Sequence, residues 1–349
     1  MTNGPVRVSV FGKTDLGRSR DHNEDSFLVA DLTTGNASLQ PEVRDHEIGP
    51  RGSLFMVADG MGGAAAGELA SAMATDLIFH HLSTAWANDP NASPTRFAFR
   101  MKEAVELANE RLYAYAREHP EVRGMGTTVT AAGVFGDDLY LTQIGDSRGY
   151  LVRNAEAIQL TKDQSLMQRL VDAGELTPEE AEQSERRNII LQALGPDPRV
   201  KVDLTRQTLR RGDVLIICSD GLSGLVKREE FAQLAEQYPD LPELCSALID
   251  RANERGGPDN ITVVTARFDG PGLPEPDEAE GVGYQVYDLD ESDEFPAEDM
   301  EVPHEAEPEV ETTADPPAPE AAAPTHRSRN LLVTAFLLVV LALLLAFLL

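Results

Sequence analysis

The sequence predicts an α+β domain in which antiparallel sheets are covered by helices. Three observations support this fold class. Strand-like apolar runs occur near both ends of residues 5–268, long helix-like segments lie between them, and short turns join neighbouring runs at Asp137-Asp138 and Asn154-Ala155-Glu156. Short turns favour antiparallel pairing, whereas a parallel pair needs a long crossover, usually helical, between its strands.

Each expected element follows from its residue pattern. Runs of apolar and β-branched residues predict strands, and apolar residues at three- and four-residue spacing predict helices. The expected strands are 6–11, 25–31, 53–58, 127–135, 139–144, 149–153, 214–218 and 261–268. The expected helices are 64–83, 95–117, 165–173 and 241–255. Residues 174–200 are charged and weakly apolar, so we expect a surface flap there.

Composition limits the classes of function. The chain has 59 Asp and Glu against 30 Lys and Arg, a formal net charge of −29. An acidic chain is poorly suited to nucleic acid or to anionic lipid headgroups, so we expect no nucleic-acid partner. Cys218 and Cys245 lie in apolar surroundings. We therefore expect core cysteines rather than a disulfide, as is typical of a reducing compartment.

The C-terminal part predicts a tether and a membrane anchor. Residues 269–330 are expected to be a disordered acidic, proline-rich tether, because 271–326 alone hold 18 Asp and Glu and ten prolines without Lys or Arg. Residues 331–349 are uncharged and almost all aliphatic. As a helix they would reach about 28 Å, close to the ~30 Å hydrocarbon core. Arg327 and Arg329 precede this span, so we expect a single-pass tail anchor in the cell membrane with the domain in the cytoplasm.

Three aspartates lie at the ends of apolar runs that are far apart in the sequence. Asp59 and Asp220 each follow such a run, and Asp259 precedes one. A core has no use for carboxylates at these places unless a positive charge lies between them. Mg²⁺ and Mn²⁺ prefer carboxylate oxygens and water. The sequence therefore indicates a site for hard divalent cations.

Six short motifs occur along the chain. Each motif alone is weak evidence for a protein family, but the six together in this order are strong evidence. They are Arg20-Asp21-His22-Asn23-Glu24-Asp25, Asp59-Gly60, Gly126-Thr127-Thr128, Gly145-Asp146-Ser147-Arg148, Ser219-Asp220-Gly221 and Asp259-Asn260. In this order they closely resemble the PPM family, the metal-dependent 2C-type serine/threonine protein phosphatases, in its bacterial form. The match runs from about residue 20 to 262, nearly the whole of 5–268.

The resemblance implies a fold and a set of site residues. The fold would be an α-β-β-α sandwich of two antiparallel sheets flanked by helices, with the site in a cleft at one edge. Two Mn²⁺ or Mg²⁺ ions would be bridged by Asp59, the first completed by Asp220 and Asp259, the second by Glu24 and the Gly60 carbonyl. Asp146 would share a third, weaker ion with Asp220. Arg20 would grip the substrate phosphate, and Asp25 would orient metal-bound water.

The implied activity is metal-dependent hydrolysis of phosphoserine and phosphothreonine on proteins. A water shared by two cations would lose its proton near neutral pH and attack phosphorus. Phosphorylated proteins would be the partners, and the reaction would reverse a bacterial Ser/Thr kinase. Two alternatives remain. One is a regulatory phosphatase of the same fold that acts on anti-sigma-type partners, and the other is an inactive scaffold that binds phosphoproteins.

Some residues also have a structural interpretation or depart from the family pattern. Asp146 lies between two strand runs, a position typical of an ordinary hairpin turn. Met61 stands where eukaryotic members have a histidine after the Asp-Gly pair. Gln164 stands where many relatives have His, and 184–188 lacks the His-Pro pair expected in the flap. The flap departures affect the expected choice of substrate more than the expected hydrolysis.

Overall fold

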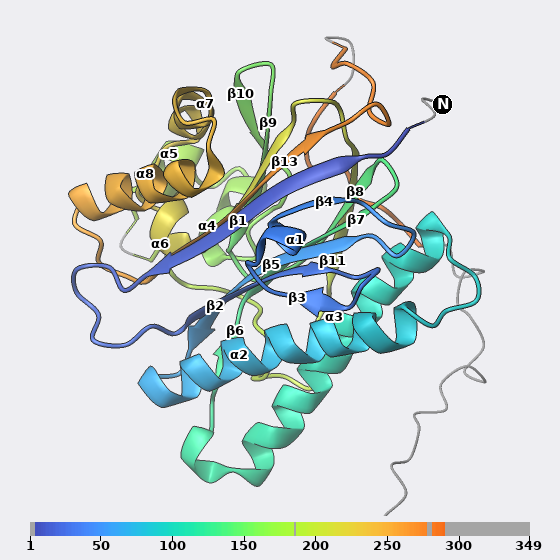
Figure 1. Ribbon diagram of the computed structural model, residues 1–349. Coiled ribbons are helices and arrows are strands. Elements are labelled where there is room, and N and C mark those ends of the chain that lie inside the picture. Colours follow the sequence, from blue (N-terminus) through green and yellow to red (C-terminus); the bar gives the residue numbers. More distant parts are fainter. Residues whose placement is uncertain (1–3, 185, 278–280, 290–349) are drawn as a thin grey trace, which may run out of the picture. The chain divides into compact units, whose positions relative to one another are not determined.

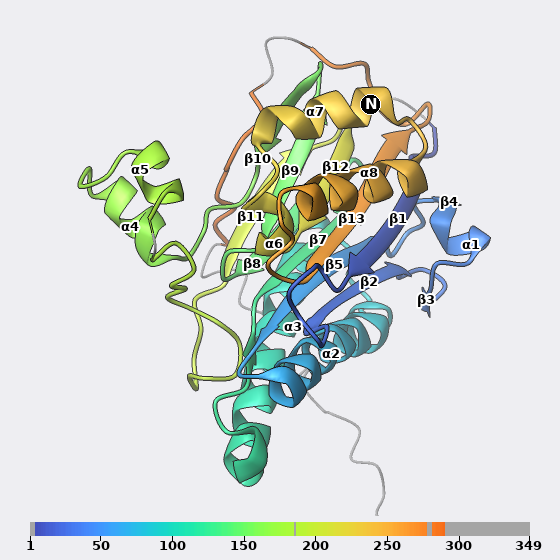
Figure 2. The same cartoon turned by 90° about the vertical axis from the view of Figure 1, so that its left-hand side faces the viewer.

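Two antiparallel sheets pack face to face, and helices cover both outer faces (Figures 1 and 2). The computed structural model describes residues 4–184, 186–277 and 281–289, all of which belong to one unit, Met1–Phe295. Every strand pairing in both sheets is antiparallel. The α-β-β-α sandwich expected from the sequence is therefore confirmed for this part of the chain.

The two sheets interleave distant parts of the sequence. The first sheet runs β10 (Glu156–Gln159), β9 (Arg148–Arg153), β12 (Val214–Cys218), β13 (Ile261–Asp269), β1 (Arg7–Asp15) and β4 (Asp45–Glu47). The second runs β11 (Asp203–Thr208), β8 (Asp138–Ile144), β7 (Val129–Phe135), β5 (Ser53–Met61), β2 (Asp25–Asp31) and β3 (Asn36–Ala37), with β6 (Gly126–Thr127) paired to β5. We call them the β13 sheet and the β5 sheet.

Helices form the two outer layers. The β5 sheet is covered by α2 (Ala64–His81) and α3 (Pro94–Glu118), and the β13 sheet by α7 (Arg228–Gln237) and α8 (Leu241–Glu254). At one side of the sandwich stand α4 (Leu166–Asp172) and α5 (Pro178–Glu182) (Figure 2). We call residues 165–200, which contain both, the flap. The remaining short elements are α1 (Pro41–Arg44), a π-turn at Leu82–Trp86, a 3₁₀ turn at Pro120–Val122 and α6 (Asp220–Ser223).

Alternating side chains along the central strands fill three apolar layers. In β5, Phe55 faces the other sheet, whereas Met56 faces α2 and α3. In β12, Leu215 faces the other sheet, and Ile216 faces the helices on the other side. Both faces of these strands are buried, which explains why the sequence shows unbroken apolar runs there rather than alternation.

The elements missing from the sequence expectation are short or lie at edges. β11 has an exposed arginine, Arg206, in the middle of polar neighbours, so it carries no apolar run. α7 is short, with acidic residues in its first turn. The flap also begins earlier than expected, because α4 is part of the excursion. The two cysteines, Cys218 and Cys245, are free and buried, as expected.

The expected tether differs in its first part, because residues after 269 pack on the domain. Leu273 is fully buried. Residues 281–289, which we call the strap, extend the β5 sheet beside β11: the Tyr287 N–H donates to the Leu204 carbonyl at 2.8 Å. The Tyr287 ring packs edge-on against Tyr140, 5.6 Å between centroids. Aromatic and aliphatic residues among the acids of this segment explain why it packs.

The rest of the expected tether, and the expected anchor at 331–349, lie outside the described residues. Within 4–184, 186–277 and 281–289, no helix combines the length and the apolar character needed to cross a membrane.

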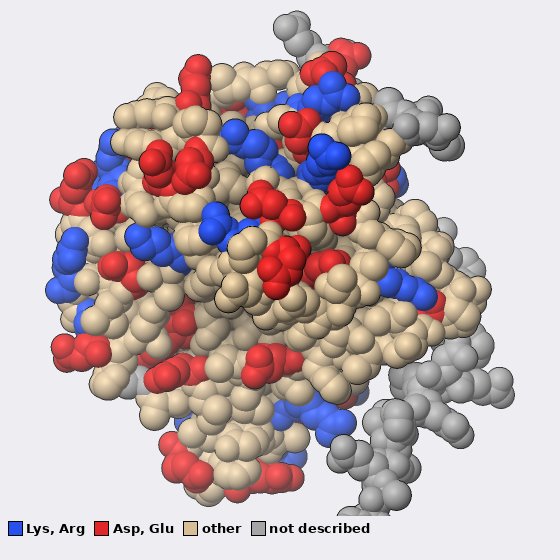
Figure 3. Space-filling model, viewed as in Figure 1, with Lys and Arg blue, Asp and Glu red and all other residues tan. Residues whose placement is uncertain are grey.

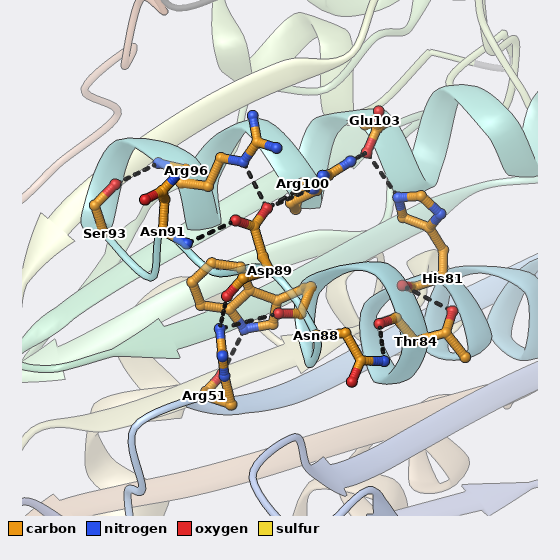
Figure 4. A network of polar contacts seen from close by, with 11 residues as sticks. Arg51, His81, Thr84, Asn88, Asp89, Asn91, Ser93, Arg96, Arg100 and Glu103 are labelled. Atoms are coloured by element: carbon orange, nitrogen blue, oxygen red, sulfur yellow. Dashed lines mark hydrogen bonds and ion pairs between the residues drawn. The ribbon is translucent and has the colours of Figure 1, made fainter. Parts of the chain in front are cut away.

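A buried ionic network fixes the connection between α2 and α3 (Figure 4). Asp89, whose side chain is inaccessible to solvent, accepts hydrogen bonds from Arg96 Nε at 2.6 Å and from Arg100 Nε and Nη2 at 3.1 Å. Arg100 also donates to Glu103 at 2.7 Å, and Glu103 pairs with His81 at 2.7 Å. Because buried charges need partners, this chain of alternating charges keeps the loop before α3 in one conformation.

Candidate active site

The expected site residues meet at one end of the sandwich because the strands that carry them are antiparallel. Asp25 begins β2 and Asp59 lies near the end of β5, and the two are directly paired across these strands. Asp220 follows the end of β12, and Asp259 precedes the start of β13. One sheet therefore supplies Asp25 and Asp59, and the other supplies Asp220 and Asp259.

A cavity of about 280 Å³ lies at this end, and its walls contain the whole expected ligand set. The lining residues are Arg20, Glu24, Asp59, Gly60, Met61, Gly62, Gly63, Thr128, Asp146, Asn188, Ile190, Asp220, Asp259 and Asn260. Asp25 is not among them. A larger cavity of about 430 Å³ lies between β11 and the strap. The described residues of its lining include no carboxylate, so the smaller acidic cavity is the candidate active site.

The backbone around Asp59 is fixed by two threonines. The Asp59 N–H donates to Thr128 Oγ1 at 3.1 Å, and the Asp59 carbonyl accepts from Thr127 Oγ1 at 2.9 Å and from the Thr128 N–H at 2.8 Å. These contacts explain the Gly126-Thr127-Thr128 motif. The threonines hold the strand end on which the Asp59 carboxylate is presented.

Gly60 lies where no side chain fits. A Cβ at this position would come within 2.2 Å of the Gly67 carbonyl oxygen and 2.5 Å of the Glu24 carbonyl oxygen. The Gly60 N–H donates to that Glu24 carbonyl at 3.1 Å. A Cβ on Gly67, in the first turn of α2, would meet the Glu24 carboxylate at 1.9 Å. Two glycines thus bring Glu24, Gly60 and α2 into close contact.

Asp146 does not lie in a hairpin, so the ordinary turn interpretation is wrong. β8 belongs to the β5 sheet, whereas β9 belongs to the β13 sheet, and the two strands are not paired. The turn Gly145-Asp146-Ser147 therefore crosses from one sheet to the other at the cavity. Gly145 has φ +98°, and a Cβ there would press on Thr128 at 2.6 Å. A buried acid on such a crossing is positioned to face the cavity.

Asn260 organises the N-terminal side of the site, a role that the sequence did not reveal. Its Oδ1 accepts from the Glu24 N–H at 2.9 Å. Its Nδ2 donates to the carbonyls of Leu16 and His22, at 3.1 and 3.0 Å. One side chain thus holds the loop that carries Arg20 against the start of β13. Only its position next to Asp259 could have pointed to it, because the partners are more than 230 residues away.

Asp25 lies behind the cavity wall and is bonded to the opposite sheet. Ser219 Oγ donates to Asp25 Oδ2 at 2.9 Å, and the same Ser219 oxygen accepts the Thr262 N–H at 3.0 Å. The contact joins the two sheets directly beneath the acidic residues. Asp25 is therefore fixed directly behind the residues that line the cavity, where it can act on them without lining the cavity itself.

Burial and mutual repulsion raise the pKa values of Asp25, Asp59, Asp146 and Asp220. Burial raises the pKa of Asp25 to about 7, with Asp220 and Asp259 adding to it. Burial, followed by the charge of Asp220, raises the pKa of Asp146 to about 7. The pKa of Asp59 is raised well above its ordinary value by burial and by Asp25 and the other acids of the cavity, and burial and Asp259 also raise that of Asp220. Such a cluster is unfavourable without a cation.

Arg20 is the one cationic side chain in the cavity lining of the described chain. Its Nη2 donates to Asp259 Oδ2 at 2.8 Å, and its side chain is about half exposed. Within the described ranges, no group of three or more His, Cys, Asp and Glu side chains has the spacing of a ready-made metal site. Which ion the cavity suits is therefore decided by the chemistry of the atoms that line it.

The donor set fits hard divalent cations. Four aspartates and a glutamate line one cavity with a backbone carbonyl at Gly60, and no cysteine or histidine lines it in the described chain. Oxygen-only donors are what Mg²⁺ and Mn²⁺ prefer. A cation would offset both the burial and the mutual repulsion that raise the pKa values of Asp59, Asp146 and Asp220. Arg20 would remain at the rim to meet an anion.

Comparison with known proteins agrees with this fold. The protein phosphatase 2C family model matches residues 38–254. Serine/threonine phosphatase stp of Listeria monocytogenes is 37% identical over 259 residues, 74% of this chain and 94% of that protein. PstP of Mycobacterium tuberculosis is 42% identical over 254 residues, 73% of this chain and 44% of that protein. A crystal structure of the PstP catalytic domain with two manganese ions has a TM-score of 0.61 and 36% identity, covering 76% of this chain and 99% of that one.

The chain belongs to the protein phosphatase 2C (PPM) family. Within that family it is a serine/threonine protein phosphatase of the bacterial type, as its named relatives are.

Proposed function

We propose that this enzyme hydrolyses phosphoserine and phosphothreonine on proteins with two Mn²⁺ or Mg²⁺ ions held in the acidic cavity. The observation that carries the proposal is the convergence of Glu24, Asp59, Asp220 and Asp259 on one cavity from both sheets. When bound, divalent cations lower the pKa of water and offset the charge of a phosphate.

The chain's own residues would divide the work as follows. Asp59 would contact both ions, Asp220 and Asp259 would hold the first, and Glu24 with the Gly60 carbonyl would hold the second. Asp146 and Asp220 would hold a third, weaker ion. Direct attack by water agrees with the lining of the cavity, because its described part offers no cysteine or serine nucleophile.

Arg20 and Asp25 would act on the substrate and on water. Arg20 lies at the rim with its side chain half exposed, so its guanidinium is accessible to a phosphate, which it can bind with two N–H groups. Substrate phosphate would compete with Asp259 for Arg20. Asp25 lies one residue from Glu24 and is held by Ser219, which supports a role in orienting the attacking water.

The test is turnover of p-nitrophenyl phosphate and of a phosphothreonine peptide, with and without Mn²⁺. We expect both substrates to be hydrolysed only when Mn²⁺ or Mg²⁺ is present. Binding of the phosphopeptide without any turnover, at saturating Mn²⁺, would instead support the inactive-scaffold alternative.

We also propose that the enzyme reverses a bacterial Ser/Thr kinase at the cell membrane. The membrane location is supported by the sequence: residues 331–349 have the length and apolar character of a membrane helix, and 290–330 would connect it to the domain. The visible face in Figure 3 carries acidic and basic side chains side by side, with no continuous basic surface for a nucleic acid.

A further inference from the structure

Three glutamine side chains connect the flap to the turn that carries Asp146. We call Gln143, Gln164 and Gln192 the glutamine cluster. Gln143 lies near the end of β8, Gln164 comes directly before the flap, and Gln192 lies within it. None of the three lines the acidic cavity.

Gln164 is paired with Gly145 through two reciprocal hydrogen bonds. The Gln164 N–H donates to the Gly145 carbonyl at 2.9 Å, and the Gly145 N–H donates to Gln164 Oε1 at 2.9 Å. Gln143 supports the same turn, because its Nε2 donates to the carbonyls of Gly145 and Ser147 at 3.2 and 3.1 Å. The residue between these two carbonyls is Asp146. Its backbone is therefore held from both sides by glutamine amides.

Gln192 links this arrangement to both ends of the flap. Its Nε2 donates to Gln164 Oε1 at 3.0 Å and to the Lys201 carbonyl at 3.1 Å, and its Oε1 accepts from the Lys201 N–H at 2.6 Å. The neighbouring Leu191 N–H donates to the Gln164 carbonyl at 2.7 Å. Because Gln164 precedes the flap and Lys201 follows it, Gln192 connects the two ends.

The same stretch of flap reaches the cavity. Asn188 and Ile190 line it, and Ile190 pairs with Ser165 in a β-bridge at the flap's beginning. Gln164 Oε1 accepts from the Gly145 N–H on one side and from Gln192 on the other. Gln164 Oε1 is thus the common hydrogen-bond acceptor for the turn that carries Asp146 and for the stretch of flap that lines the cavity.

We propose that Gln164 and Gln192 are positioning residues that hold the flap and the Asp146 turn as one unit. Opening of the flap would displace Asp146 and weaken its hold on a cation, and a cation on Asp146 would favour the closed flap. This proposal rests on the proposed function, because it takes Asp146 as a ligand. The effect is reciprocal because of thermodynamic linkage: if flap closure favours cation binding at Asp146, cation binding must favour flap closure by the same free energy.

The experiment compares Gln192→Ala and Gln192→Met with Gln168→Ala in the full-length enzyme. Gln192→Met keeps the length of the side chain but none of its hydrogen bonds. Gln168 is the matched control, since it lies in the same flap and, among the described residues, its side chain hydrogen-bonds to Asp172 alone, at 3.0 Å, on its own helix. Two quantities are measured: trypsin cleavage in the flap, where Arg186 and Arg187 are exposed, and the Mn²⁺ concentration that half-saturates turnover of p-nitrophenyl phosphate.

Both Gln192 variants should be cleaved about tenfold faster than wild type, because the three hydrogen bonds of the Gln192 side chain are lost. Their half-saturating Mn²⁺ concentration should rise about tenfold, while kcat at saturating Mn²⁺ stays within about twofold. Gln168→Ala should change neither quantity by more than about twofold. In the unmutated enzyme, Mn²⁺ should slow cleavage at the flap.

Faster cleavage with an unchanged Mn²⁺ requirement would overturn the coupling, and unchanged cleavage would show that the cluster does not hold the flap. Gln164→Ala tests the same coupling from the other side of the Gln164–Gln192 hydrogen bond. A thermal unfolding curve for each variant shows whether the fold as a whole is retained. If wild type has no Mn²⁺-dependent turnover, the proposed function fails. Calorimetric Mn²⁺ binding together with the trypsin rates would then still decide the coupling.

Discussion

Asp25 and Asp59 face each other directly across the antiparallel strands β2 and β5. Opposed like charges destabilise a sheet, and here the pKa of Asp59 is raised by burial and next by the charge of Asp25. A hydrophobic or neutral pair would hold these strands together better. The pair therefore marks a place where stability is given up for a charge-binding site.

Asp59→Asn should lower Mn²⁺-dependent turnover of p-nitrophenyl phosphate by more than about 100-fold, because outer-shell substitutions at metal sites already lose 10–100-fold. The metal-free variant should be at least as stable to urea as the wild type, since one buried like charge is removed. Asp137→Asn is the matched control, because Asp137 is exposed at the β7–β8 hairpin. Turnover within a few-fold of wild type at saturating Mn²⁺ would contradict the site.

Arg20→Ala should raise KM for a phosphopeptide by roughly ten- to a hundredfold, because one charge-assisted hydrogen bond contributes about 1.5–3 kcal/mol. Mn²⁺ affinity should persist, since loss of Arg20 frees Asp259 from its ion pair. Arg18→Ala, two residues away, is the control and should change KM only slightly. An unchanged KM together with weaker Mn²⁺ binding in calorimetry would show that Arg20 serves the ligands and does not bind phosphate.

Asp89→Asn should destabilise the domain by about 3–5 kcal/mol, because it leaves the buried guanidiniums of Arg96 and Arg100 without their shared carboxylate. Glu106→Gln is the control: its pair with Lys102 on the same helix is exposed, so its loss should cost about 0.5 kcal/mol or less. Urea unfolding at pH 7 measures both.

The pH dependence of this effect has a defined sign. Burial tends to raise the pKa of Asp89, but the hydrogen bonds from Arg96, Asn91 and Arg100 outweigh it, so its pKa is lowered. A carboxyl with a lowered pKa in the folded state stabilises the fold above its unfolded value of about 3.9 and loses that contribution as pH falls further. The difference between wild type and Asp89→Asn should therefore shrink below about pH 4. A constant difference from pH 7 to pH 3 would contradict this account.

A chain that ends at Leu289 should be more stable than one that ends at Asp269. The longer chain keeps Leu273, which is fully buried, and Tyr287, which packs on Tyr140. Full burial of one large apolar side chain contributes about 1.5–3 kcal/mol, and Tyr287 is only partly buried, so the shorter chain should lose about 2 kcal/mol or more. Tyr287→Ala in the longer chain should give an intermediate value in urea unfolding. Equal midpoints for the two chains would show that the strap adds nothing.

Deleting residues 330–349 should leave turnover of p-nitrophenyl phosphate within about twofold. The full-length protein should pellet with membranes and come off with detergent, not with high salt, if 331–349 is a membrane helix. Removal by salt alone would indicate a peripheral association. Loss of activity on deletion would show that the segment acts on the catalytic domain.

The sequence predicted those parts of the fold and site in which one short stretch carries the whole signal. The buried strand β5 is such a case, since its apolar run ends in an acid and a glycine, Asp59 and Gly60. β11 was missed because an edge strand with Arg206 on its surface lacks an apolar pattern. The packed strap was missed because the acidic, proline-rich composition of residues 271–326 as a whole outweighed the two tyrosines of the strap.

Other parts of the site depend on contacts between distant residues. The role of Asn260 and the bond from Ser219 to Asp25 join positions about 200 residues apart or more, which no local pattern reports. Asp146 was predicted from its motif, but only the fold shows that its turn crosses between sheets. Gln164 was recognised as a departure from the family pattern, and only its hydrogen bonds show which groups it joins.

The acids of the cavity are divided between two sheets, with Asp59 on one and Asp220 and Asp259 beside the other. The separation of the two groups is thus set by the thickness of the apolar layer between the sheets, where Leu141 and Leu215 lie. Protein interiors are close-packed enough that a single methylene is felt. Under the proposed function, the volume of this apolar layer should therefore affect ion affinity, and aliphatic exchanges far from any substrate should alter turnover even when Asp59, Asp220 and Asp259 are all retained.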